Sequence, residues 1–401
     1  MSASEGSKAA ASALAGSAFI MATSAIGPGF ITQTTRFTEQ LTTSFGFIIV
    51  CSIVLDIVVQ LNIWRVISVS GMRAQDLANR LAPGMGYVLA ILIVLGGLAF
   101  NIGNVAGAAM GVQVMVGADL WIGAVASVII SLFVFWNNEA GKALDLFSKI
   151  LGGIMIALMG YIAFSSAPPV MEVVHHAVLP ETIDTTAIIV LVGGTVGGYI
   201  SFAGVHRLLE AGITGEENIP SISRAAVKGI MLASAMRILL FLAALGIVVT
   251  GATLDEGNPA ATVFKLAAGE VGYRIFGVVL WCAAITSVVG SAYTSVSFLR
   301  TFHPFFETHL RIIITFFITC SAAIFLVVGR PVSILIIAGA LNAFILPLAL
   351  GIILFASRKA AIVNQYRHPW WMIIAGWVVV VALGLMSIYA LTSDLGRLWN
   401  Q

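Results

Sequence analysis

Polar side chains interrupt the first apolar segment of the chain directly after a Gly-Pro-Gly break. Residues 25–40 read AIGPGFITQTTRFTEQ. Pro28 has no N–H to donate and the flanking glycines weaken a helix, so carbonyl groups are freed and the backbone can unwind. We therefore expect TQTTRFTE to form the unwound centre of a broken helix that faces a wet cavity. Its candidate substrate-binding residues are Thr32, Gln33, Thr34, Thr35, Arg36 and Glu39.

A second glycine-rich break, GGTVGGY at residues 193–199, interrupts another apolar segment. Glycines here would let the backbone approach a substrate closely. The helix that starts near Gly198 and Tyr199 would offer free N–H groups and a positive dipole end to a carboxylate. The candidate substrate-binding residues at this break, with polar residues of other segments added, are Gly194, Gly197, Gly198, Tyr199, Ser201, Asn101, Asn104 and Asn342.

Ionisable residues inside apolar segments are costly and are functional candidates by default. Asp56 lies four residues before Gln60, so both lie on one helical face. Asp56 is either a cavity-facing proton or cation group or the structural partner of Arg237 or Arg36. For His206 the alternatives are a proton-coupling role and a charged network at the inner end of its helix. We take Asp56, Gln60, His206 and Arg237 as coupling or gating candidates.

The elements that position these residues are membrane-spanning helices. Of 401 residues 59% are hydrophobic and only 9% are charged, and the mean hydropathy is +1.04, far outside the range of soluble domains. Segments of roughly 20 apolar residues can cross the bilayer. We predict eleven spans, at residues 13–43, 45–69, 86–115, 120–137, 143–164, 185–211, 226–251, 273–299, 309–328, 332–357 and 369–393.

The two breaks open two blocks of five spans, at about 13–164 and 185–357, and an extra helix follows at 369–393. Because five is odd, the second block must cross the membrane upside down relative to the first. Interrupted segments at matching positions of two halves point to a transporter binding site at the bilayer midplane. We predict an all-α polytopic protein that forms a single integral membrane domain over 1–401.

Charge distribution predicts orientation and partners. Most of the 20 Lys and Arg residues fall on the side of the N-terminus, which predicts a cytoplasmic N-terminus and an outside C-terminus. A bacterial inner membrane is the expected location, and the lipid bilayer and a small-molecule or ion substrate are the expected partners. The net charge of +2 is too small to indicate nucleic acid. No enzyme signature is present, so neither catalysis nor a cofactor is expected, and we expect a monomer.

Several motifs resemble the NRAMP divalent-metal transporters. They are GPGF at 27–30, QLNIWRVISVSG at 60–71, DLA at 76–78, GALNAFILPLALGIILFASRK at 339–359 and GW at 376–377. The resemblance covers essentially the whole chain. It implies the LeuT-like inverted repeat, with helices 1 and 6 broken around the substrate, and import of manganese, iron or related ions coupled to protons.

The chain departs from this family where the chemistry should lie. The first helix has GPGF in place of the Asp-Pro-Gly-Asn that binds the ion. In the sixth helix Gly197 occupies the position of the metal-binding Met and Tyr199 that of a His. The proton-relay Asp and Glu of helix 3 correspond to Asn101 and Asn104. Replacing Met by Gly197 would enlarge the cavity, as in a divergent branch that resembles magnesium transporters taking a largely hydrated ion.

Three functions follow from this pattern. The resemblance favours alternating-access transport of a cation, and the missing carboxylate and thioether make a hydrated divalent ion such as Mg²⁺ a better candidate than bare Mn²⁺ or Fe²⁺. A magnesium site still needs negative charge, and Glu39 lies three residues from Arg36, which would cancel it in a helix. The alternatives are transport of a small polar or zwitterionic organic solute and a membrane binding protein without transport.

Overall fold

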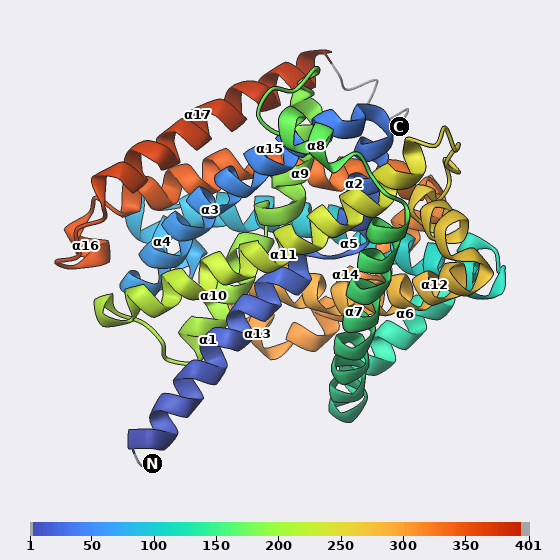
Figure 1. Cartoon of the computed structure of the whole chain (residues 1–401). Helices are drawn as coiled ribbons and strands as arrows, with labels where there is room; N and C mark the ends of the chain where they lie inside the picture. The colour runs from blue at the N-terminus through green and yellow to red at the C-terminus, as the bar shows by residue number, and fades with distance from the viewer. Residues whose placement is uncertain (1–2, 301, 394–401) are drawn as a thin grey trace.

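The computed structural model describes residues 3–300 and 302–393, and this part of the chain is helical throughout (Figure 1). Its α-helices, in chain order, are α1 (Ala3–Ala25), α2 (Pro28–Leu41), α3 (Phe45–Ser70), α4 (Ala74–Leu81), α5 (Met85–Val116), α6 (Leu120–Trp136), α7 (Asn138–Ser165), α8 (Val170–His176), α9 (Thr185–Val196), α10 (Ile200–Glu210), α11 (Ile219–Val248), α12 (Pro259–Ser297), α13 (Pro304–Thr308), α14 (Leu310–Val328), α15 (Pro331–Ala356), α16 (Ala360–Val363) and α17 (Trp370–Ser393). Two short 3₁₀ turns, η1 (Thr42–Ser44) and η2 (Glu216–Asn218), complete the set.

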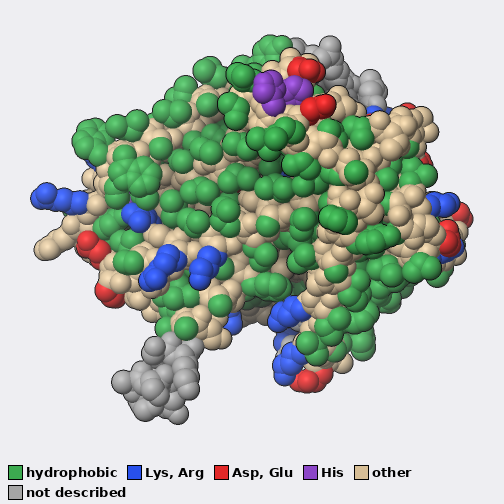
Figure 2. Space-filling view, viewed as in Figure 1, with side chains coloured by type: hydrophobic (Ala, Val, Ile, Leu, Met, Phe, Trp, Pro, Cys, Tyr) green, Lys and Arg blue, Asp and Glu red, His purple; other side chains and the backbone are tan. Residues whose placement is uncertain are grey.

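The prediction of an all-α polytopic membrane protein is confirmed. Nine stretches of the described residues are helical, long and apolar enough to cross a membrane, and Ala10–Ala25 and Leu120–Trp136 are shorter apolar helices. The predicted spans 226–251 and 273–299 begin later than the helices that contain them, because α11 begins at Ile219 and α12 at Pro259. In α12 the backbone leaves helical geometry at Ala268 and Gly269, so its first part forms a separate arm before the predicted span. Figure 2 shows the broad hydrophobic surface of one face of the molecule.

Both predicted breaks are present, but the first lies earlier than expected. Between α1 and α2 only Ile26 and Gly27 are non-helical, and Pro28 is the first residue of α2. The expectation that TQTTRFTE is unwound is wrong. Proline fits the first turn of a helix, where its missing N–H would have no partner, so the residues after it continue as a regular helix. The second break, between α9 and α10, covers residues 197–199 and includes Gly198 with a φ of +52°.

Helix α5 passes through the centre of the bundle and packs along α12, α15 and α6. Its small residues allow this close packing. A Cβ atom on Gly107 would lie 2.2 Å from Cβ of Pro28, so a larger side chain would push the start of α2 away. The first residues of α1 and the last turn of α17 lie at opposite ends of the molecule (Figure 1).

Candidate functional site

Helix α5 connects the two breaks through its side chains. The ring of Phe100 packs edge-on against Tyr199 of the second break, with ring centres 5.7 Å apart. One turn further, Oδ1 of Asn104 would lie 3.5 Å from a Cβ placed on Gly27 of the first break. Asn101 lies between these two contacts, and neither of its amide atoms has a partner in the protein. The predicted residues Asn101, Asn104 and Tyr199 are thus brought together.

Two serines of α12 complete this region. Oγ of Ser287 would lie 3.4 Å from a Cβ on Gly27, and Ser291 accepts a hydrogen bond from Nδ2 of Asn104 at 3.4 Å. We call Gly27, Asn101, Asn104, Tyr199, Ser287 and Ser291 the break cluster. Its side chains are amides, hydroxyls and a phenol, and none is a carboxylate or a thioether. Ser287 and Ser291 are polar positions of the predicted span 273–299 that the structure places at the first break, although neither was among the predicted binding residues.

Gln33 is the predicted residue of α2 that faces the second broken helix. Its side chain is fully buried, and Nε2 donates to the carbonyl of Leu335 at 2.8 Å. Its Oε1 has no protein partner and would lie 2.5 Å from a Cβ on Gly194. The side chain of Gln33 therefore reaches from α2 to α9 and α15. This position beside the second broken helix is the one expected of a substrate-binding residue.

The other polar residues of α2 differ in whether their polar atoms have partners in the protein. Thr35 donates to the carbonyl of Ile31 in its own helix at 3.0 Å. Thr32 and Thr34 are buried, and Oγ1 of Thr34 has no protein partner. Arg36 and Glu39 form an ion pair at 2.7 Å with side chains 21% and 26% exposed, which is the pairing expected if the segment stays helical.

Asn342 packs against the second break, where its Oδ1 would meet a Cβ on Gly198, and Ser201 bridges the break. Nδ2 of Asn342 donates to the carbonyls of Gly96 at 2.9 Å and Ala338 at 2.8 Å, and Ser201 donates to the carbonyl of Val196 across the break. The expectation that Gly197 enlarges the cavity is wrong. Its φ is −76°, but a Cβ there would lie 2.3 Å from the carbonyl oxygen of Gly193, so protein atoms already fill that position.

A second buried polar group surrounds Arg237. This side chain is 3% exposed, donates from Nη1 to Oγ1 of Thr195 at 2.9 Å, and lies 4.4 Å above the ring of Phe30. Asp56 is 1% exposed and accepts from Ser52 at 3.0 Å. Of the two partners considered for Asp56, Arg237 is its charged neighbour, because Arg36 pairs with Glu39. Gln60 is fully buried and neither of its amide atoms has a protein partner.

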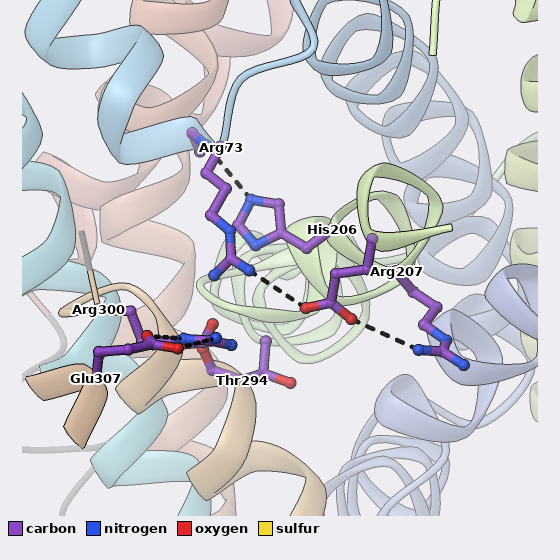
Figure 3. Close-up of polar contacts among 9 residues, drawn as sticks. Arg73, His206, Arg207, Thr294, Arg300 and Glu307 are labelled. Atoms are coloured by element: carbon purple, nitrogen blue, oxygen red, sulfur yellow. Dashed lines mark hydrogen bonds and ion pairs between the residues drawn. The ribbon is translucent and has the colours of Figure 1, made fainter. Parts of the chain in front are cut away.

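His206 lies beside a charged network at the C-terminal end of α10 (Figure 3). Its Nε2 accepts from the backbone N–H of Ala74 at 3.4 Å, so it fixes the start of α4. Glu210 pairs with Arg73 at 3.3 Å and Arg207 at 3.6 Å. The geometry supports the network alternative for His206.

Beside this network, Arg300 binds Glu307 through two contacts of 2.6 Å (Figure 3). The hydrogen bond from Arg300 lowers the pKa of Glu307. This bidentate pair joins the end of α12 to α13.

A passage leads from the N-terminal side of the molecule to the first break. Two adjoining cavities of about 320 and 630 Å³ share the lining residues Phe19, Thr23, Lys149 and Thr286. The smaller cavity reaches Ile26 and Phe30, and the larger one reaches Arg207. Figure 2 shows Lys and Arg side chains near the lower end of α7, which borders the passage. The sequence patterns did not predict this passage, because its walls are mostly ordinary apolar side chains.

The described residues do not fit a transition-metal site. No group of three or more His, Cys, Asp or Glu side chains in this part of the chain is arranged to hold a metal ion. Asp56 is a buried carboxylate near the breaks, and its charge faces the guanidinium of Arg237. The site can therefore form hydrogen bonds to a polar group but offers no soft ligand to a metal.

Comparison of the sequence with protein families gives one match. Residues 18–393 match the model of the natural resistance-associated macrophage protein-like (Nramp) family. The chain is 54% identical over 389 residues to the uncharacterized membrane protein YcsG of Bacillus subtilis, covering 97% of this chain and 96% of YcsG. It is also 51% identical over 375 residues to an uncharacterized membrane protein of Haemophilus influenzae, covering 94% of each chain.

Solved structures show the same fold. The manganese transporter of Eremococcus coleocola superposes with a TM-score of 0.76 at 16% identity, covering 98% of this chain and 88% of the transporter. MhsT in complex with L-phenylalanine superposes with a TM-score of 0.62 at 18% identity, covering 94% of this chain and 98% of MhsT. The LeuT-like fold implied by the resemblance is confirmed.

Proposed function

Because the chain belongs to the Nramp family, a family of transport proteins rather than enzymes, we propose that it is a secondary transporter that works by alternating access on a small polar solute. The solute is held between the α1/α2 and α9/α10 breaks, against α5 and α12. The observation that carries this proposal is the chemistry of the break cluster, in which amide and hydroxyl groups surround both breaks.

A bare transition metal is a poor fit to these residues. Mn²⁺ and Fe²⁺ are selected by carboxylate, imidazole or sulfur ligands, and Asn104, Ser287 and Ser291 supply none of these. The first-helix position that would carry an acid holds Gly27. Family membership alone suggests a cation, but the residues that would bind a dehydrated metal are absent from the break cluster.

A hydrated divalent cation is the second candidate. Three buried amide oxygens, in Gln33, Asn101 and Asn342, have no partner in the protein. Such hard oxygen ligands suit Mg²⁺ and its bound water. This candidate lacks compensating negative charge, because Glu39 is neutralised by Arg36 and Asp56 faces Arg237.

Uptake into proteoliposomes tests the proposal. We expect a labelled polar solute to accumulate, and Asn104→Leu to abolish accumulation, because leucine removes the amide that faces the first break and Ser291. Asn364→Gly is the control, because Asn364 is exposed and its φ of +54° suits glycine, so this variant should leave uptake unchanged. Accumulation of Mg²⁺ but of no organic solute would favour the second candidate, and no accumulation of either would leave a binding protein without transport.

We also propose that the N-terminal side is cytoplasmic, as the distribution of Lys and Arg predicts. The passage would then open toward the cytoplasm in this conformation. Labelling of a cysteine introduced at Ser12, which lines the passage, from the cytoplasmic but not the external side of whole cells would support this orientation.

A further inference from the structure

Arg237 and Asp56 carry opposite charges on neighbouring helices but do not form an ion pair. Helices α11 and α3 pack together, and each of the two side chains is the charged neighbour of the other. Within the part of the chain that the structure describes, neither side chain lies within 4.0 Å of an oppositely charged group, so neither forms an ion pair. Each charge is therefore left incompletely compensated inside the bundle.

The atoms without partners are of complementary kinds. Nε and Nη2 of Arg237 donate to no protein atom, and Oδ1 of Asp56 accepts from none. Burial of a charged group without hydrogen bonds is costly. A ligand with an acceptor for the guanidinium and a donor for the carboxylate would satisfy both groups at once.

The position of Arg237 connects it to both breaks. It donates to Thr195, two residues before Gly197, where the second break begins. The ring of Phe30 covers its guanidinium at 4.4 Å, and Phe30 follows Gly27 of the first break by three residues. Because Phe30 also lines the smaller cavity, this ring separates Arg237 from the end of the passage.

The charges along the passage favour an anionic group. Lys149 lines both cavities and Arg207 lines the larger one, and neither cavity is lined by an Asp or Glu. A passage lined by one sign of charge concentrates ligand groups of the opposite sign. A cation would meet repulsion along the route that leads to the first break.

We propose that the transported solute carries a carboxylate that binds Arg237 and a donor group, such as an ammonium, that binds Asp56, with Phe30 moving aside to admit it. This inference rests on the proposed transport function and narrows its substrate to zwitterions of the amino-acid class. Guanidinium and carboxylate form charge-assisted, often bidentate hydrogen bonds, which accounts for an arginine with free donors at this depth.

Binding to the purified protein tests the substrate class. Thermal unfolding is followed with three sets of probes: L-amino acids, their amides, which lack the carboxylate, and the matching acids, which lack the amine. We expect an amino acid to stabilise the protein and both analogues to bind about tenfold more weakly or worse, as the loss of one charge-assisted hydrogen bond predicts. Stabilisation by the amide or by the acid that equals stabilisation by the amino acid, or no stabilisation by any amino acid, would overturn the inference.

Variants assign the two charges. Arg237→Gln should remove the preference for the amino acid over its amide, and Asp56→Asn should reduce the preference for the amino acid over the acid that lacks the amine. Arg224→Gln is the matched control, because Arg224 lies on the same helix as Arg237 but is exposed, donates to the carbonyl of Pro220 and should keep the wild-type preference. An unchanged preference in Arg237→Gln would contradict the assignment.

A second measurement does not depend on Arg237 variants folding. Phenylglyoxal modification of Arg237, read by peptide mass spectrometry, should rise several-fold in Phe30→Ala and fall again when the stabilising amino acid is added. Equal modification in wild type and Phe30→Ala would show that Phe30 is not the barrier. An amino acid that binds with this pattern but does not enter proteoliposomes would refute transport and leave only the assignment of Arg237 and Asp56 as its binding residues. Uptake of solutes without a carboxylate would support transport and refute that assignment.

Discussion

Two adjacent glycines of α9 provide a matched pair of substitutions. A Cβ on Gly193 would lie 2.0 Å from the carbonyl oxygen of Gly339 and 2.7 Å from the backbone nitrogen of Ala343. These are backbone atoms, so Gly193→Ala must push α9 and α15 apart, at a cost of about 3 kcal/mol or more. A Cβ on Gly194 would meet Oε1 of Gln33 at 2.5 Å, and Gln33 can turn away.

Gly194→Ala should therefore destabilise the fold less than Gly193→Ala and still be harmful to function. Loss of the bond from Gln33 to Leu335 leaves buried polar groups without partners and costs about 1–3 kcal/mol, of which the higher helix propensity of alanine returns about 1 kcal/mol. The displaced amide would nevertheless be lost to the substrate. Thermal unfolding in detergent and uptake in proteoliposomes measure the two effects separately. The reasoning is refuted if Gly193→Ala is as stable as wild type, or if Gly194→Ala is stable and transports normally.

Three further predictions follow from single contacts. Arg36→Ala should cost only about 1 kcal/mol or less in unfolding free energy, because its pair with Glu39 is about a quarter exposed; a larger loss by chemical denaturation would show a stronger coupling. Substrate movement should carry no protons along α5, where Asn101 and Asn104 replace acids, and substrate-driven acidification of proteoliposomes that disappears in Asn104→Leu would contradict this. Burial lowers the pKa of His368 to about 4 from an ordinary value of 6.5. Between pH 6.5 and pH 4 the unfolded state therefore binds a proton at His368 and the folded state does not. Lowering the pH over this interval costs up to ~3 kcal/mol of the free energy of unfolding. His368→Gln should flatten the melting temperature over that interval, and an identical pH profile in both proteins would argue against it.

That two helices are broken, and in which apolar segments, could be predicted from the sequence because Gly and Pro restrict or weaken helical backbone. The span pattern follows from hydropathy, since each apolar segment needs a length set by the bilayer. The exact site of the first break could not be predicted, because Pro28 disrupts a helix when it lies inside and favours one when it lies in the first turn. Only the structure shows that Pro28 begins α2.

The partners of the candidate residues required the fold. Asn101, Asn104 and Tyr199 were predicted from their positions relative to the family pattern, and they do lie around the breaks. The choice between Arg237 and Arg36 as the neighbour of Asp56 depends on how α3 and α11 pack, which no local pattern encodes. The roles of Phe30 and Thr195 also follow only from contacts with Arg237, although both residues lie in the quoted break motifs.

The most direct test of the account is isothermal titration of one purified preparation with MnCl₂, MgCl₂ and the solute panel. Amide and hydroxyl groups around the breaks predict saturable heat with a polar organic solute and no high-affinity binding of Mn²⁺. Loss of that heat in Asn104→Leu would place the solute in the break cluster. High-affinity binding of Mn²⁺ that is lost in the same variant would contradict the account.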